Sequence, residues 1–259
     1  MGVHQRIDRI ARRELAAFLK KPEFFPSSHD ILHFEGLNGP DGIKRKSPAK
    51  DEPWHYLDPA DEADDKLRTM ISDHMHNLTT ALAENNQQRA AFEAAWLAHA
   101  ITDGLTPAHH YPLEEKLEEL RGEGLETRTT RRKKIFLPGE TRRHQLRNNW
   151  EFWGAKGVMT THFGFELGIA TTIATGRLPH TTPNGNDIVR LKNEGFMPLF
   201  DEALEKIVAL KLYEEFYKVG WTRRLARDTK NKLVPEIVKV VTLAWLDCVQ
   251  AAEAKRTKK

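Results

Sequence analysis

Histidine and carboxylate side chains in the middle of the chain recur at spacings that suit metal binding. His99 and Asp103 lie four residues apart, and His109 follows after a glycine and a proline. Residues four apart in a helix share one face, with Cβ atoms about 6 Å apart, so the two side chains can bind one cation. The glycine and proline are expected to end the helix, which allows His109 to turn toward a neighbouring cation.

A second pair, His162 and Glu166, has the same four-residue spacing. Taken alone, each pair has a plainer interpretation. A histidine on the core side of a helix is more often structural, and a His-x-x-x-Asp pair is more often a surface ion pair. Two such pairs, with a further histidine beyond the first, favour clustered metal ions. The only cysteine is Cys248, so imidazole and carboxylate groups would have to hold the metal.

Three residues nearer the N-terminus extend the set of candidate ligands. His4 begins the first expected helix, His55 stands just before another, and Asp41 lies upstream of His55. Asp is common in turns, so Asp41 by itself is more simply a turn residue, and His4 by itself a surface residue. His74 and His76 have no carboxylate at ligand spacing on their helix and are interpreted as structural or surface residues.

The order of these motifs resembles that of the zinc-dependent phospholipase C and single-strand-specific nuclease superfamily. The family's first motif, His-x-x-x-Asp followed by Pro and then His, matches His99, Asp103, Pro107 and His109. Its later His-x-x-x-Glu pair matches His162 and Glu166, and its His-Tyr-aliphatic-Asp motif is similar to the run from His55 to Asp58. The resemblance covers most of the chain and implies an all-helical fold that holds up to three zinc ions.

The resemblance also implies which side chains bind each zinc ion. The first ion would be bound by Asp41, His55, His99 and Asp103. The second would be bound by His109, His162 and Glu166, with positions left for water, and His110 is an alternative to His109. The third would be bound by His4, by an oxygen of Asp103 shared with another ion, and by the chain's N-terminal amine and carbonyl, where Met1 replaces the family's usual tryptophan.

The resemblance implies a zinc-dependent phosphodiester hydrolase acting on phospholipid or single-stranded nucleic acid. Zinc lowers the pKa of a bound water to about 7, which allows the water to attack phosphorus. The resemblance implies that Asp41 orients or deprotonates this water. The alternative is a non-catalytic helical domain in which zinc only supports the fold. A di-iron bundle fits less well, because that design uses Glu-x-x-His pairs.

Apolar residues at helical spacing indicate the elements that must position these side chains. The sequence predicts one all-α domain over residues 1–259, with helices at 4–20, 61–85, 87–103, 113–121, 142–174, 187–218, 221–231 and 234–256. The segment 22–59 is interpreted as a long ordered loop that presents Asp41 and His55. Gly154 and Gly157 are expected to bend the helix at 142–174. The aromatic side chains on either side of these glycines are assigned to the core, with stacking on a base or contact with an acyl chain as the alternative: Trp150, Phe152, Trp153 and Phe163.

Composition and charge limit the function further. The 259 residues are 39% hydrophobic and 30% charged, with a formal net charge of +3, and no apolar run reaches the roughly 20 residues of a membrane span. Residues 113–147 form an insertion relative to the family, and its basic segment is either a solvated loop or a rim that attracts phosphate-bearing substrates. The start of the chain lacks the apolar core of a secretory signal. A cytoplasmic protein is therefore expected as the sequence stands, and an exported one if it is a trimmed mature form.

Overall fold

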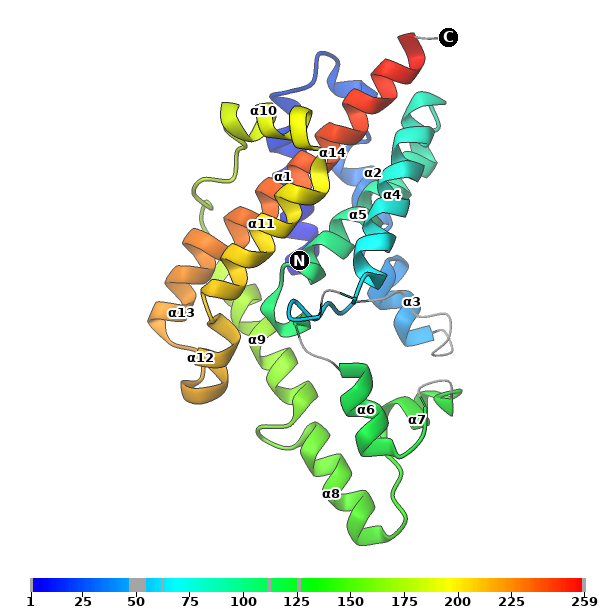
Figure 1. Ribbon diagram of the computed structural model, residues 1–259, viewed down its shortest axis with the longest axis vertical. Coiled ribbons are helices and arrows are strands. Elements are labelled where there is room, and N and C mark those ends of the chain that lie inside the picture. Colours follow the sequence, from blue (N-terminus) through cyan, green and yellow to red (C-terminus); the bar gives the residue numbers. More distant parts are fainter. Residues whose placement is uncertain (1, 47–54, 62, 111–112, 125–126, 258–259) are drawn as a thin grey trace.

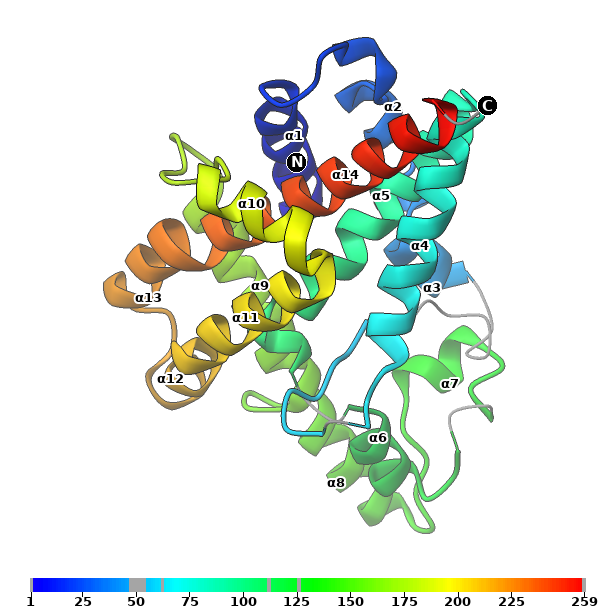
Figure 2. The same cartoon turned by 45° about the horizontal axis from the view of Figure 1, so that its top comes forward.

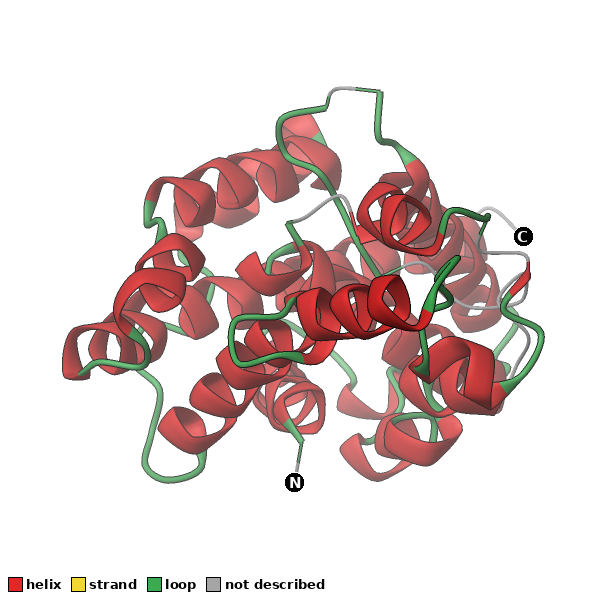
Figure 3. Ribbon diagram, turned by 90° about the horizontal axis from the view of Figure 1, so that it is seen from below, coloured by secondary structure: helices red, strands yellow, loops and turns green. Residues whose placement is uncertain are grey.

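The chain folds as an assembly of helices in a computed structural model (Figure 1), which describes residues 2–46, 55–61, 63–110, 113–124 and 127–257. These residues contain helices and loops and no strand, as Figure 3 shows. The predicted all-α class is therefore confirmed. Among the described residues, no helix is both long enough and apolar enough to cross a membrane.

The first half of the chain contains five α-helices and three short 3₁₀ turns among the described residues. They are α1 (Val3–Ala16), η1 (Pro22–Phe24), α2 (Ser28–His33), η2 (Gly36–Asn38), α3 (Pro40–Lys46), α4 (Lys66–Ala83), α5 (Gln87–Gly104) and η4 (Pro107–His109). The expectation of one long loop over 22–59 is wrong, because α2 and α3 lie within it. Both are too short to show helical periodicity. At α2, Ser27 and Asp30 cap each other's backbone N–H groups, which stabilises this single turn and a half.

The second half of the chain is divided more finely than its apolar pattern suggests. Its helices are α6 (Leu113–Arg121), α7 (Arg131–Ile135), α8 (Arg142–Trp153), α9 (Val158–Ile173), α10 (Gly185–Glu194), α11 (Phe196–Ala209), α12 (Leu212–Val219), α13 (Arg223–Asp228), the π turn η6 (Thr229–Leu233) and α14 (Val234–Thr257). Instead of bending, the expected helix at 142–174 stops at Trp153 and restarts at Val158. A Cβ on Gly157 would lie 2.6 Å from the backbone of Phe152, so only glycine permits this close reversal.

Helix α5 lies at the centre of the molecule. Every residue from Leu97 to His109 is buried, as expected for a helix surrounded by others. It packs against its hairpin partner α4 and against α14, whose fully buried Trp245 donates its indole N–H to the carbonyl of Ala94 (3.1 Å). This packing fixes the orientation of the one helix that carries both His99 and Asp103.

Helices α6, α7 and α8 form a lobe at one end of the molecule (Figures 1 and 2). The lobe has its own small apolar cluster, which consists of Leu117, Leu120, Leu137 and Phe152. The assignment of the nearby aromatic residues to the core is wrong for three of four. Phe152 is buried, but Trp150, Trp153 and Phe163 are 71%, 37% and 51% exposed. Trp150 and Trp153 lie on the face of α8 opposite its buried residues Asn148 and Phe152, and Phe163 lies on α9.

Candidate metal centre

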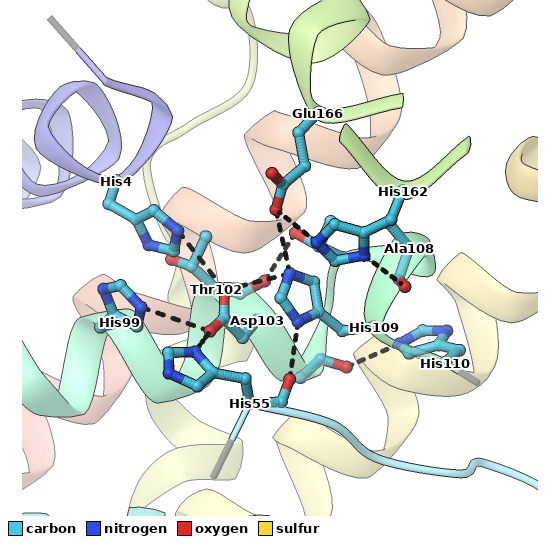
Figure 4. Close-up of polar contacts among 12 residues, drawn as sticks. His4, His55, His99, Thr102, Asp103, Ala108, His109, His110, His162 and Glu166 are labelled. Atoms are coloured by element: carbon cyan, nitrogen blue, oxygen red, sulfur yellow. Dashed lines mark hydrogen bonds and ion pairs between the residues drawn. The ribbon is translucent and has the colours of Figure 1, made fainter. Parts of the chain in front are cut away.

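The eight side chains singled out from the sequence come together from six parts of the chain. His4 lies on α1, Asp41 on α3, His55 in the loop before α4, His99 and Asp103 on α5, His109 in η4, and His162 and Glu166 on α9. Figure 4 shows seven of them turned toward one another. Three groups bring their donor atoms within 4.8 Å of one another: His4 with His99 and Asp103, Asp41 with His55 and His99, and His109 with His162 and Glu166.

The Asp103 carboxylate is the hub of this arrangement (Figure 4). Its Oδ1 lies 3.4 Å from His4 Nε2 and 3.5 Å from His109 Nε2. Its Oδ2 lies 2.5 Å from His55 Nδ1 and 3.3 Å from His99 Nε2. One buried carboxylate therefore contacts a histidine from each of four parts of the chain. Of the three groups, Asp103 belongs to the one that contains His4 and His99.

The group of His109, His162 and Glu166 has the geometry of a preformed metal site. The Nδ1–H of His109 donates to the carbonyl of His55 (2.7 Å), and that of His162 donates to the carbonyl of Ala108 (3.1 Å). These bonds leave each Nε2 lone pair directed at Glu166 Oε1, at 3.1 and 3.2 Å. Metal-binding histidines are oriented in this way, with the second ring nitrogen donating to a carbonyl or carboxylate.

The donor spacing suits tetrahedral zinc. Zinc bonds of 2.0–2.1 Å place two tetrahedral ligands about 3.3 Å apart. The separations between His Nε2 and carboxylate oxygen in the cluster are 3.1–3.5 Å. In addition, the buried Nε2 of His99 makes no hydrogen bond to any described residue. Imidazole nitrogen and carboxylate oxygen are ligands that zinc accepts, so the residues fit the ion.

Electrostatic interactions within the cluster are strong because most of it is buried. Burial by itself would raise the pKa of the Asp103 carboxyl, but the charges of His109, His99 and His4 outweigh it and hold that pKa well below its usual range. Burial would lower the pKa of His99, yet Asp103 and Glu35 raise it well above its ordinary value. The carboxylates thus stabilise positive charge within the cluster. That charge can be carried by protonated histidines or by a bound metal ion.

Two edges of the centre are open to solvent. Asp41 is exposed and the Glu166 side chain is 35% exposed, whereas His55, His99 and Asp103 are almost fully buried. A substrate can therefore approach the cluster where Asp41 and Glu166 lie. The N-terminal amine predicted as a ligand belongs to Met1, which lies outside the described residues.

The other histidines that were considered lie outside the centre. His110 donates its Nε2–H to the carbonyl of Gly104 (2.7 Å), and burial lowers its pKa to about 4. The structure therefore places His109, and not His110, among the grouped side chains. His74 contacts the buried Glu93 of α5 (2.6 Å), which is a structural role, and His76 is exposed.

Two buried carboxyl groups behind His99 were missed in the sequence. Glu35 Oε1 lies 3.3 Å from His99 Nδ1, so this histidine also has a partner on its second nitrogen. Asp8 is 1% exposed, and neither of its oxygens has a hydrogen-bond partner among the described residues. Burial, and then the charge of Glu35, raises the pKa of Asp8 well above its usual range. Asp8 follows His4 by four residues, and this spacing was available as a signal, but nothing in the sequence marks Glu35.

A cavity lies beside α9, one residue from the centre. It has a volume of about 620 Å³, and its lining includes Trp150, Tyr213, Tyr217, Lys156 and Thr161, the residue that precedes His162. Its walls combine aromatic rings with charged side chains of both signs, because Glu151 and Glu214 line it together with lysines. A ligand with both apolar and polar parts fits this lining.

Comparison of the chain with models of protein families, with curated proteins and with solved structures finds no match.

Proposed function

We propose that this protein is a zinc-dependent phosphodiester hydrolase whose substrate is a phospholipid or a single-stranded nucleic acid. The observation that carries the proposal is the convergence of three donor groups around Asp103, two of which share His99. Sites that hold two metal ions close together are typical of enzymes that hydrolyse phosphoesters. The sequence motifs that resemble the phospholipase C and nuclease superfamily support the same activity.

When bound, zinc supplies an activated water and positive charge that stabilises the phosphoryl oxygens. The chain's own residues then have separate tasks. The bonds from His109 and His162 to backbone carbonyls hold both imidazoles in one tautomer and orientation. Asp41, exposed at the edge of the centre, accepts the proton of the attacking water and orients it toward phosphorus. Asp103 remains ionised throughout, because its pKa is held low.

A second candidate is a helical domain in which zinc only supports the fold. The near-complete burial of His55, His99 and Asp103 favours that reading, because structural sites are closed. The exposure of Asp41 and Glu166 favours hydrolysis, because catalytic sites keep a position for water and substrate. The exposure of Asp41 and Glu166 is the stronger argument, because both carboxylates are members of the donor groups.

The test is hydrolysis of bis-p-nitrophenyl phosphate by the full chain. We expect the activity to disappear after dialysis against a chelator and to return when zinc is added. Asp41→Asn should lose at least 100-fold in kcat, in line with removal of a general base, and Asp73→Asn, also exposed but on α4, should retain full activity. A zinc-loaded protein without activity would leave only the structural alternative, and hydrolysis that persists in the presence of the chelator would contradict a zinc-dependent enzyme.

A further inference from the structure

Large apolar side chains are exposed mainly on one part of the molecule. Of the twelve that are exposed among the described residues, seven fall between positions 135 and 167: Ile135, Phe136, Leu146, Trp150, Trp153, Phe163 and Leu167. Single exposed apolar residues are common, but a concentration of this kind marks an interaction site. We refer to these seven residues as the lobe surface.

Helix α8 presents one apolar stripe to solvent. Leu146, Trp150 and Trp153 are spaced four and then three residues apart, so they share one face, while the buried Asn148 and Phe152 lie on the opposite face. At 100° per residue, arginines stand on both sides of the stripe: Arg142 on one side, and Arg143 and Arg147 on the other. The helix therefore buries one face in the lobe and exposes an apolar stripe, flanked by arginines, on the other.

Contacts join this stripe to α7 and α9. The indole N–H of Trp153 donates to the carbonyl of Ile135 (2.7 Å), which connects α8 to the end of α7. The rings of Trp153 and Phe163 lie nearly parallel, with centroids 6.4 Å apart, and Leu167 follows Phe163 by one helical turn. The exposed apolar residues of the three helices thus form a continuous strip.

The strip lies among strongly basic residues. Residues 127–147 contain eight Lys and Arg residues and a single acidic residue, Glu140. Within the described part of the chain, ion pairs involve none of Arg132, Lys133, Arg142 and Arg143, all of which are exposed. Their charge is therefore available to an external anionic partner.

We propose that the lobe surface docks on an anionic phospholipid bilayer. Tryptophan and phenylalanine beside leucine, with arginine and lysine at the margins, are the residues by which proteins bind in the interface of an anionic membrane. A nucleic-acid surface would also combine basic and aromatic residues. However, Ile135, Leu146 and Leu167 cannot stack on bases, whereas the acyl chains of a bilayer can cover them. Trp150 also lines the cavity beside α9, so docking would bring that cavity to the membrane.

This inference goes beyond hydrolysis, because the surface can bind lipid whether or not the metal centre is catalytic. The test is flotation of the full chain with vesicles of phosphatidylcholine and phosphatidylglycerol in a molar ratio of about three to one. The chain should float with these vesicles, less so at high salt, and only weakly with pure phosphatidylcholine. The double variant Leu146→Ser/Trp150→Ala should reduce partitioning by tenfold or more, and Arg142→Glu/Arg143→Glu should abolish the preference for the anionic lipid.

A control variant changes one apolar and one basic residue that are exposed elsewhere on the molecule. Val189→Ser/Lys192→Glu alters an exposed apolar and an exposed basic residue of α10, which lies away from the lobe in Figures 1 and 2, and should leave flotation unchanged. Hydrolysis of bis-p-nitrophenyl phosphate, measured in parallel, reports on the metal centre separately. Three outcomes would overturn the proposal: no flotation of the unaltered chain, equal loss in the control, or loss of binding to oligodeoxythymidine in the lobe variants with flotation unaffected.

Discussion

Asp103 shows at the residue scale how this protein tolerates a buried charge. The carboxylate is 1% exposed, and an unpaired charge at such depth would be very costly. Contacts with His4, His55, His99 and His109 compensate for that cost. Of the candidate ligands, only Asp103 has contacts with histidines of four elements, so its replacement affects several ligands at once.

We predict that Asp103→Asn lowers the zinc content of the purified protein more than replacement of any single histidine does. The amide keeps the shape of the carboxylate but loses the negative charge that binds a cation. Metal analysis after dialysis against zinc-buffered solution measures this. His74→Gln, which alters a histidine paired outside the centre, is the control. A fully loaded Asp103→Asn protein would contradict the role of the hub.

Glu35 is predicted to act through His99. Glu35→Gln should weaken zinc binding by 10- to 100-fold, because carboxylate partners of ligating histidines make the imidazole a better donor. The fold should persist, since the amide oxygen still accepts the bond from His99 Nδ1. Competition with a chromogenic chelator gives the affinity, and Glu84→Gln, which changes an exposed carboxylate at the end of α4, should match the unaltered chain. Equal affinities in the two variants would show that Glu35 does not support the metal.

The raised pKa of His99 predicts how the stability of the metal-free protein and the strength of zinc binding change with pH. In the metal-free protein a raised pKa contributes stability below the unfolded value of about 6.5, and this contribution is lost as pH rises through the folded value. Zinc binding needs neutral imidazole, so it strengthens over the same range. The difference in Tm between zinc-loaded and chelator-treated protein should therefore increase from about pH 6 to pH 8. A difference that shrinks toward alkaline pH would refute the assignment.

At the scale of the elements, α9 connects the centre to the rest of the fold. It carries His162 and Glu166, and its buried Gly168 lies directly against the ring of Trp221. A Cβ on Gly168 would overlap that ring. The position of α9, and with it two of the candidate ligands, therefore depends on the absence of one side chain.

Gly168→Ala is predicted to reduce the free energy of unfolding by about 1–3 kcal/mol, as overpacking does in other cores. Because α9 must shift to accommodate the methyl group, zinc should be lost preferentially from the group of His109, His162 and Glu166. Thermal unfolding and metal analysis measure the two effects. Gly185→Ala is the matched control, since nothing lies within 4 Å of a Cβ at that position. Unchanged Tm and zinc content in Gly168→Ala would show that α9 adapts freely.

The sequence indicated which candidate ligands lie together better than it indicated the bounds of the helices around them, for a physical reason. Spacing along one helix identified His99 with Asp103 and His162 with Glu166, because residues four apart share a face. Glu35 approaches His99 through the tertiary fold, which no local spacing reveals. The short helix α2 depends on a capping interaction and not on periodicity, and the break before α9 depends on backbone contacts of Gly157.

At the scale of the whole molecule, the central helices and the lobe differ in whether their tryptophans are buried or exposed. Trp245 is fully buried beneath α5, whereas Trp150 on the lobe is largely exposed. Residue type alone predicts burial for both. Their difference arises from the fold, since every residue of α14 from Val240 to Leu246 is buried, whereas α8 is buried only on the side of Asn148 and Phe152. The central helices thus build the candidate metal centre, and the lobe offers a surface to an external partner.

The most direct test of the metal centre is anomalous diffraction at the zinc absorption edge from crystals grown with zinc. We predict a peak in each of the three donor groups, within about 2.0–2.1 Å of the Nε2 atoms of His109 and His162 in the group that contains Glu166. Crystals with zinc in solution but no anomalous peak in any of the three groups would contradict the account.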